Sequence, residues 1–95
     1  MIPVEVSQWI IEQGCGEVVS EQPVSGGSIN NSRRLTTDIG ITYFLKTNPG
    51  APEDMFTAEA AGLAALRVSG APRVPRVHLV GQDFILMEDL QPNGR

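Results

Sequence analysis

The stretch "ITYFLKTN", residues 41–48, decides the fold, because it joins a run of strand-forming residues to the only lysine of the chain. All other cations among the seven Lys and Arg residues are arginines. Side chains alternate between the two faces of a strand, so Phe44 and Lys46 share one face. Tyr43 and Leu45 share the other. A single ammonium group at the end of such a strand indicates a specific partner on its own face of the sheet.

Length and charge limit the classes of protein to which the chain can belong. Its 95 residues form at most one domain with a modest core. The formal net charge of −4 and the pI near 4.8 argue against a general binder of nucleic acid or anionic membranes, which needs a basic face. The start of the chain lacks a basic segment followed by an apolar run, so we expect neither a secretory signal nor a membrane span. A cytoplasmic location is the resulting prediction.

Hydrophobic spacing and turn residues divide the chain into two helices and five strands. The second helix is favoured by its alanines and leucines and by Pro52, Glu53 and Asp54 at its positive end. Strands that cluster in sequence favour an α+β fold with an antiparallel sheet. The expected elements are a helix at 3–13, strands at 17–24, 32–38 and 41–47, a helix at 52–70, and strands at 76–80 and 83–87.

An acidic residue, Glu59, falls on the apolar stripe of the second helix. The stripe comprises Met55, Glu59, Gly62, Leu63 and Leu66. An unpaired carboxylate facing the sheet would be costly. The sequence therefore predicts an ion pair between Glu59 and Lys46.

Two residues with reactive side chains are expected to be structural. Cys15 is the only cysteine and cannot form an internal disulfide, and its setting between Gly14 and Gly16 is typical of a loop. His78 is the only histidine and has neither a nucleophile nor a cluster of metal ligands near it in the sequence.

A strand lysine paired with a helix glutamate resembles the amino-terminal lobe of kinases, where the lysine holds the α- and β-phosphates of the nucleotide. "SGGSINNS", residues 25–32, lies where such a lobe has its phosphate-covering loop, and "ILMEDL", residues 85–90, lies where the last strand enters the hinge between lobes. Together with "YFLKTN", "MFTAEAAGLAAL" and "VPRVHLVG", these segments resemble the fructosamine kinase (ketosamine-3-kinase) family over about residues 5–90.

The resemblance implies an α+β fold, the protein-kinase-like amino-terminal lobe. Its five-stranded antiparallel sheet would carry a packed αC-type helix and an extra N-terminal helix. Residues 1–90 would form the lobe, with the N-terminal helix and turn at 1–16 and the sheet plus helix at 17–90. Residues 91–95 would begin the interlobe linker, and the carboxy-terminal lobe would lie outside this sequence.

The resemblance also implies the site and its chemistry. Lys46 would neutralise phosphate charge, Glu59 would aim Lys46, and the backbone of Glu88 and Leu90 would bind adenine. The implied ATP-binding residues are Gly26, Gly27, Ser28, Ile29, Asn30, Phe44, Lys46, Met87, Glu88 and Leu90. The reaction would be ATP-dependent phosphorylation of a sugar hydroxyl on a glycated amine or protein. Mg²⁺ ligands and the catalytic base would come from the other lobe, so the 95-residue chain alone is expected to be inactive.

The sequence departs from related patterns at several positions. The glycine loop is not the G-x-G-x-x-G of protein kinases, and no glycine immediately precedes Lys46 as a Walker A motif requires. Phe44 is bulky on the side that would cover adenine, where protein kinases favour alanine. Ser28 replaces a cysteine that many members of the family carry, so a redox switch at that position is not expected.

Alternative interpretations remain open at this stage. Lys46 and Glu59 could form a purely structural salt bridge, Gly26 and Gly27 a simple tight turn, and residues 87–90 an ordinary strand end. The lobe could also belong to an aminoglycoside or choline kinase-like enzyme, or be a non-catalytic nucleotide-binding or dimerisation module. A homodimer of the isolated lobe is a further expectation, through an exposed apolar patch or through exchange of the first strand. The expected patch consists of Val24, Phe44, Met87 and Leu90.

Overall fold

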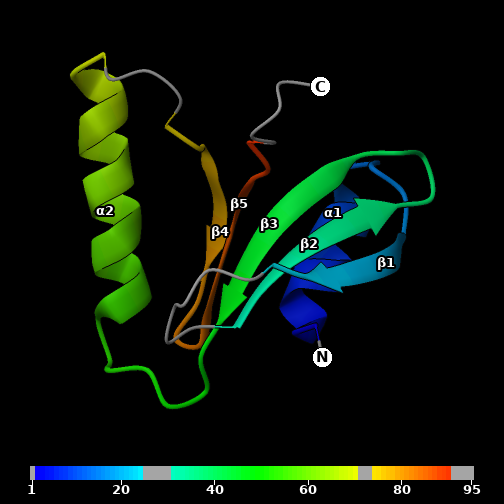
Figure 1. Ribbon diagram of the computed structural model, residues 1–95, viewed down its shortest axis with the longest axis horizontal. Coiled ribbons are helices and arrows are strands. Elements are labelled where there is room, and N and C mark those ends of the chain that lie inside the picture. The colour runs from blue at the N-terminus through cyan, green and yellow to red at the C-terminus, as the bar shows by residue number, and fades with distance from the viewer. Residues whose placement is uncertain (1, 25–30, 71–73, 91–95) are drawn as a thin grey trace.

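The computed structural model describes residues 2–24, 31–70 and 74–90, and all seven expected elements are present in it (Figure 1). They are α1 (Val4–Glu12), β1 (Val18–Pro23), β2 (Asn31–Thr37), β3 (Thr42–Thr47), α2 (Met55–Val68), β4 (Val77–Val80) and β5 (Phe84–Glu88). Helix α2 begins later than expected because the Met55 N–H donates to the Pro52 carbonyl oxygen at 3.1 Å, which closes a turn before the helix. Neither helix in the described part of the chain is long and apolar enough to cross a membrane.

The five strands form one antiparallel sheet in the order β1-β2-β3-β5-β4. Strand β5 pairs with β3 although α2 and β4 come between them in the sequence. In this register Phe44 lies opposite Met87 and Lys46 opposite Ile85. The end of β5 therefore lies next to the strand that carries the lysine.

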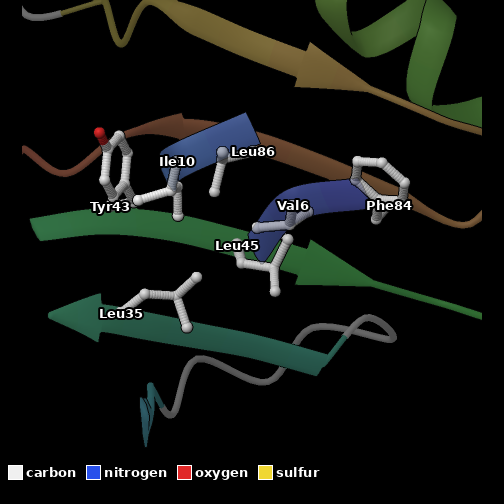
Figure 2. Close-up of a cluster of buried hydrophobic side chains, with 7 residues drawn as sticks. All are labelled: Val6, Ile10, Leu35, Tyr43, Leu45, Phe84 and Leu86. Atoms are coloured by element: carbon white, nitrogen blue, oxygen red, sulfur yellow. The ribbon is translucent and has the colours of Figure 1, made fainter. Parts of the chain in front are cut away.

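Helix α1 covers one face of the sheet (Figures 1 and 2). Val6 and Ile10 are fully buried there against side chains from three strands. The buried cluster in Figure 2 comprises Val6, Ile10, Leu35, Tyr43, Leu45, Phe84 and Leu86. Burying a side chain of this size contributes about 1.5–3 kcal/mol, so this face holds most of the core.

Helix α2 covers the opposite face through Phe56, which is 1% exposed and packs with Ile85 and Met87. The expected stripe is wrong at its C-terminal end, because Leu66 is 49% exposed and Gly62 is also exposed. The buried contacts of α2 begin at Met55 and end at Leu63, so the last turns extend beyond the sheet. Lys46 and Phe44 lie on this α2 face because they alternate with the buried Tyr43 and Leu45.

Two expectations about association need correction. Met87 is only 3% exposed, because β5 lies between β3 and β4 and under α2, so it cannot contribute to an exposed patch. Strand β1 pairs with β2 of the same chain, and the Val24 N–H extends that pairing by donating to the Ser32 carbonyl at 2.8 Å. Exchange of the first strand is therefore not present in this structure.

Candidate functional site

Lys46 and Glu59 form the predicted ion pair, which is confirmed by geometry. The Lys46 Nζ donates to Glu59 Oε2 at 2.7 Å. The lysine reaches from β3 and the glutamate from the half-buried side of α2, with side-chain exposures of 25% and 27%. Partly exposed pairs of this kind contribute little to stability. Their effect is to fix the position of the ammonium group.

A cavity of about 350 Å³ adjoins this pair. Its walls come from β2, β3, α2 and β5, from the segment before β4, and from the residues that follow β1 and β5. The lining residues are Val24, Arg34, Phe44, Lys46, Glu59, Leu63, Pro75, Met87, Glu88, Asp89 and Leu90. A concave, largely apolar surface with a few converging charges is typical of a small-molecule site.

The structure brings half of the predicted nucleotide residues to this cavity. Phe44, Lys46, Met87, Glu88 and Leu90 all line it. The glycine-loop positions Gly26, Gly27, Ser28, Ile29 and Asn30 lie outside the described residues. Contact of either group with a nucleotide stays a prediction.

The segment that leaves β5 is held to the strand beside it. The Glu88 N–H donates to the Arg76 carbonyl at 2.8 Å, and the Arg76 N–H donates to Glu88 Oε1 at 3.1 Å. The backbone N–H of Glu88 is thus used within the protein. The predicted contact between Glu88 and adenine would therefore depend on the carbonyl oxygen.

Arg34 and Asp89 also line the cavity and are not identified by the sequence pattern. The Arg34 Nε donates to Asp89 Oδ2 at 2.9 Å. Because Arg34 alternates with the buried Leu35, it lies on the same face of the sheet as Lys46. This alternation can be recognised in the sequence. Its pairing with Asp89 depends on the spatial order of the strands, which the sequence does not reveal.

Cys15 and His78 lie on the other side of the sheet, with the aromatic residues there. The His78 ring centroid is 5.3 Å from that of Trp9 and 5.4 Å from that of Tyr43. Burial lowers the pKa of His78. The charge of Glu88 raises this pKa and the charge of Arg76 lowers it, both by less than burial does. Burial and a hydrogen bond with Cys15 raise the pKa of Tyr43. This packing agrees with the structural roles expected for both residues.

Metal binding has no candidate centre in the part of the chain that the structure covers. Residues 2–24, 31–70 and 74–90 contain no group of three or more His, Cys, Asp or Glu side chains that could hold an ion.

Comparison with known proteins gives concordant matches. The family model described as Fructosamine kinase matches residues 3–94. The chloroplastic protein-ribulosamine 3-kinase of Oryza sativa subsp. indica is 34% identical over 92 residues, which cover 90% of this chain and 27% of that protein. A probable ketoamine kinase of Thermus thermophilus is 39% identical over 70 residues, covering 74% of this chain and 24% of that protein.

A solved structure matches as well. The crystal structure of a proposed fructosamine-3-kinase from Haemophilus somnus 129PT has a TM-score of 0.72 and 29% sequence identity, covering 90% of this chain and 31% of that one. This chain spans less than a third of the length of each of these relatives. The α+β, kinase-like fold expected from the sequence is confirmed by the structural match. Together with the family model, which matches nearly the whole sequence, it shows that the chain belongs to the fructosamine kinase family.

Proposed function

We propose that this chain is the ATP-binding amino-terminal lobe of a kinase that phosphorylates the sugar of a glycated amine or protein. One observation carries the proposal: the Lys46 ammonium group is held 2.7 Å from Glu59 in the wall of a cavity, in a chain of this family. The names of the relatives point to fructosamine, ribulosamine and ketoamine substrates. The proposal covers all three of these substrate classes.

Six of the residues that line the cavity have a function in this proposal. Phosphoryl transfer depends on charge neutralisation and positioning. Lys46 neutralises the α- and β-phosphates, and Glu59 keeps the ammonium group aimed at them. Phe44 and Met87 provide apolar contact for the base, and the backbone at Glu88 and Leu90 accepts or donates hydrogen bonds at its edge. ATP supplies the phosphoryl group that is transferred.

Family membership favours this proposal over the other kinases considered from the sequence. An aminoglycoside or choline kinase would share the ion pair, but the family model and the relatives are fructosamine, ribulosamine and ketoamine kinases. No contact among the described residues favours a non-catalytic nucleotide-binding or dimerisation module. We also propose that residues 1–95 alone do not catalyse the reaction, because they span less than a third of each relative.

Kinetics of the full-length protein test the proposal. With ATP, Mg²⁺ and a fructosamine or ribulosamine derivative of lysine, we expect ADP release and a new sugar phosphate detectable by ³¹P NMR. Lys46→Met should lower kcat/KM by about 10²-fold or more, since the charge it removes is needed in the transition state. Arg67→Met is the matched control, because Arg67 lies on the exposed C-terminal turn of α2 and contacts the Val74 carbonyl. Unchanged turnover in Lys46→Met would refute the role of the lysine, and activity only on choline or aminoglycosides would refute the substrate class.

The proposal also covers location and association. We propose a cytoplasmic protein, while the name of the rice relative places that protein in the chloroplast. We also propose that the isolated chain dimerises through the partly buried Val24, Phe44 and Leu90. Light scattering over a concentration series tests the dimer, and a monomeric mass at high concentration would exclude it.

A further inference from the structure

An ion pair that the proposed function does not use lies in the same cavity as Lys46. The Arg34 Nε donates to Asp89 Oδ2 at 2.9 Å, and the Asp89 side chain is only 2% exposed. The Arg34 side chain is 27% exposed. A carboxylate buried to this extent requires a cationic or hydrogen-bonding partner.

The pair connects two strands that are not neighbours. Arg34 belongs to β2 and Asp89 follows the end of β5, while β3 lies between these strands. Arg34 is directly opposite Phe44, and Phe44 is directly opposite Met87. Because neighbouring strands are about 4.8 Å apart, the contact spans about 10 Å of the sheet. The Arg34 side chain therefore crosses the face of β3 beside Phe44, at the cavity.

The segment after β5 is held from both sides by this arrangement. Glu88 is hydrogen-bonded to the backbone of Arg76, next to β4, through its N–H and its carboxylate. Asp89, the next residue, is bound from the opposite direction by Arg34. Residues 88–90 line the cavity at the place where the base of a nucleotide is proposed to bind. Their position thus depends on the backbone of Arg76, on the β4 side of β5, and on the guanidinium group of Arg34, on the β3 side.

Loss of the guanidinium group would act on this segment first. Without Arg34, the buried Asp89 carboxylate would lose the guanidinium group that contacts it at 2.9 Å, and removing one partner of a buried pair is destabilising. The segment can relieve this cost by moving so that Asp89 reaches water. Such a movement would displace the backbone of Glu88 and Leu90 from the cavity wall, but it would leave Lys46 and Glu59 in place on β3 and α2.

We propose that Arg34 is a positioning residue for nucleotide binding: by binding Asp89 it fixes residues 88–90 as the wall that receives the base. This inference rests on the proposed function, because it assumes that the cavity binds ATP. The two ion pairs would then have different roles in the same cavity. Lys46 and Glu59 act on the phosphates, whereas Arg34 and Asp89 set the affinity for the base.

The neighbouring residue on β2 provides a matched control. Arg33 has the same side chain and is 29% exposed, and it also forms an ion pair, with Glu21 at 3.3 Å. By strand alternation it lies on the face of the sheet opposite Arg34. In the full-length protein, Arg34→Met should raise the KM for ATP about tenfold and leave kcat within about twofold, because ground-state binding is lost and not chemistry. Arg33→Met should change neither constant.

Two further variants test whether Arg34 acts through Asp89. Asp89→Asn keeps the shape of the side chain, removes its charge, and should raise the KM for ATP in the same way. If the two residues work as one unit, the double variant should have a KM no higher than the worse single variant. If the KM of the double variant rises by the product of the two single-variant increases, the two residues act independently, and the proposal is overturned. Asp89→Asn also gives the decisive measurement if Arg34→Met does not fold.

Amide hydrogen exchange tests the positioning without any nucleotide. Exchange at residues 88–90 should be about tenfold faster in Arg34→Met than in the wild type and unchanged in Arg33→Met. Equal exchange and equal KM in Arg34→Met and Arg33→Met would overturn the inference. A wild-type protein that neither binds nor uses ATP would instead refute the proposed function. The exchange measurement would then show whether Arg34 positions this segment at all.

Discussion

Glu59 Oε2 lies 2.7 Å from Lys46 Nζ, and this contact joins the N-terminal half of α2 to the end of β3. The same helix is attached to the sheet by Phe56, which is almost completely buried. The helix therefore has one residue that anchors it and another that positions the ammonium group. Their effects can be separated by mutation.

Glu59→Gln should impair catalysis without unfolding the protein. The amide can still contact Lys46 but no longer supplies the negative charge that holds it. We expect kcat/KM of the full-length protein to fall about tenfold, less than for Lys46→Met. Glu53→Gln, at an exposed position before α2, is the control and should behave as wild type. If Glu59→Gln has wild-type kinetics, the ion pair is structural only.

Phe56→Ala should destabilise the lobe strongly. Phe56 is 1% exposed and contacts the cluster containing Ile85 and Met87, so the substitution leaves a cavity between α2 and the sheet. The expected loss in the free energy of unfolding is about 3–5 kcal/mol. Leu66→Ala, on the same helix but 49% exposed, should cost less than about 1 kcal/mol. Urea unfolding measures both, and equal losses would contradict the assignment of the buried face of α2.

Two glycine-to-alanine substitutions should change the free energy of unfolding in opposite directions. A Cβ at Gly81 would lie 2.5 Å from Cε2 and 2.9 Å from Cζ of Phe84, whose ring is buried in the core, so the cost should be about 1–3 kcal/mol. A Cβ at Gly62 meets nothing within 4 Å in the exposed part of α2, so alanine should stabilise by about 0.5–1 kcal/mol. Thermal unfolding compares them. A stable Gly81→Ala variant would mean that the Phe84 ring can move aside.

His78 should make stability depend on pH near neutrality. Burial against Trp9 and Tyr43 lowers the pKa of His78 below its ordinary value of about 6.5, so the folded state binds the proton less readily than the unfolded state. The contribution of His78 to the free energy of unfolding should therefore be greatest above about pH 6.5. It should decrease as the pH falls from there toward the pKa of the folded state. NMR titration of the single histidine should show the lowered pKa. His78→Gln should remove the slope between about pH 7 and pH 5.5, and a slope that persists in this variant would assign it to other groups.

The predicted elements came from local signals that the tertiary structure did not override. Alternation around Lys46 and the alanine-rich helix after it were sufficient to predict both elements and the ion pair. The limits of the stripe on α2 were not predictable in the same way. Met55 and Leu66 both fall on the predicted apolar stripe. Only the packing of the helix against the sheet shows that Phe56 is the anchor and that Leu66 lies beyond the sheet.

Contacts that depend on strand order were missed for a different reason. Local patterns in the sequence do not indicate that β5 lies beside β3. They therefore predict neither the burial of Met87 nor the contact between Asp89 and Arg34. An arginine on a strand and an aspartate after another are ordinary surface residues until the order of the strands is known. The ion pair between Arg34 and Asp89 is thus visible only in three dimensions.

The central place of β3 in the sheet has a consequence for protein synthesis. One neighbour, β2, precedes it in the sequence, but the other, β5, emerges from the ribosome only after α2 and β4. At translation rates of about 5–20 residues per second, the free hydrogen-bonding edge of β3 stays unpaired for roughly 2–8 s in each nascent chain. Unpaired strand edges recruit other chains. Codons that slow translation between Asn48 and Asp83 should therefore increase aggregation during expression, with no change in the amino-acid sequence.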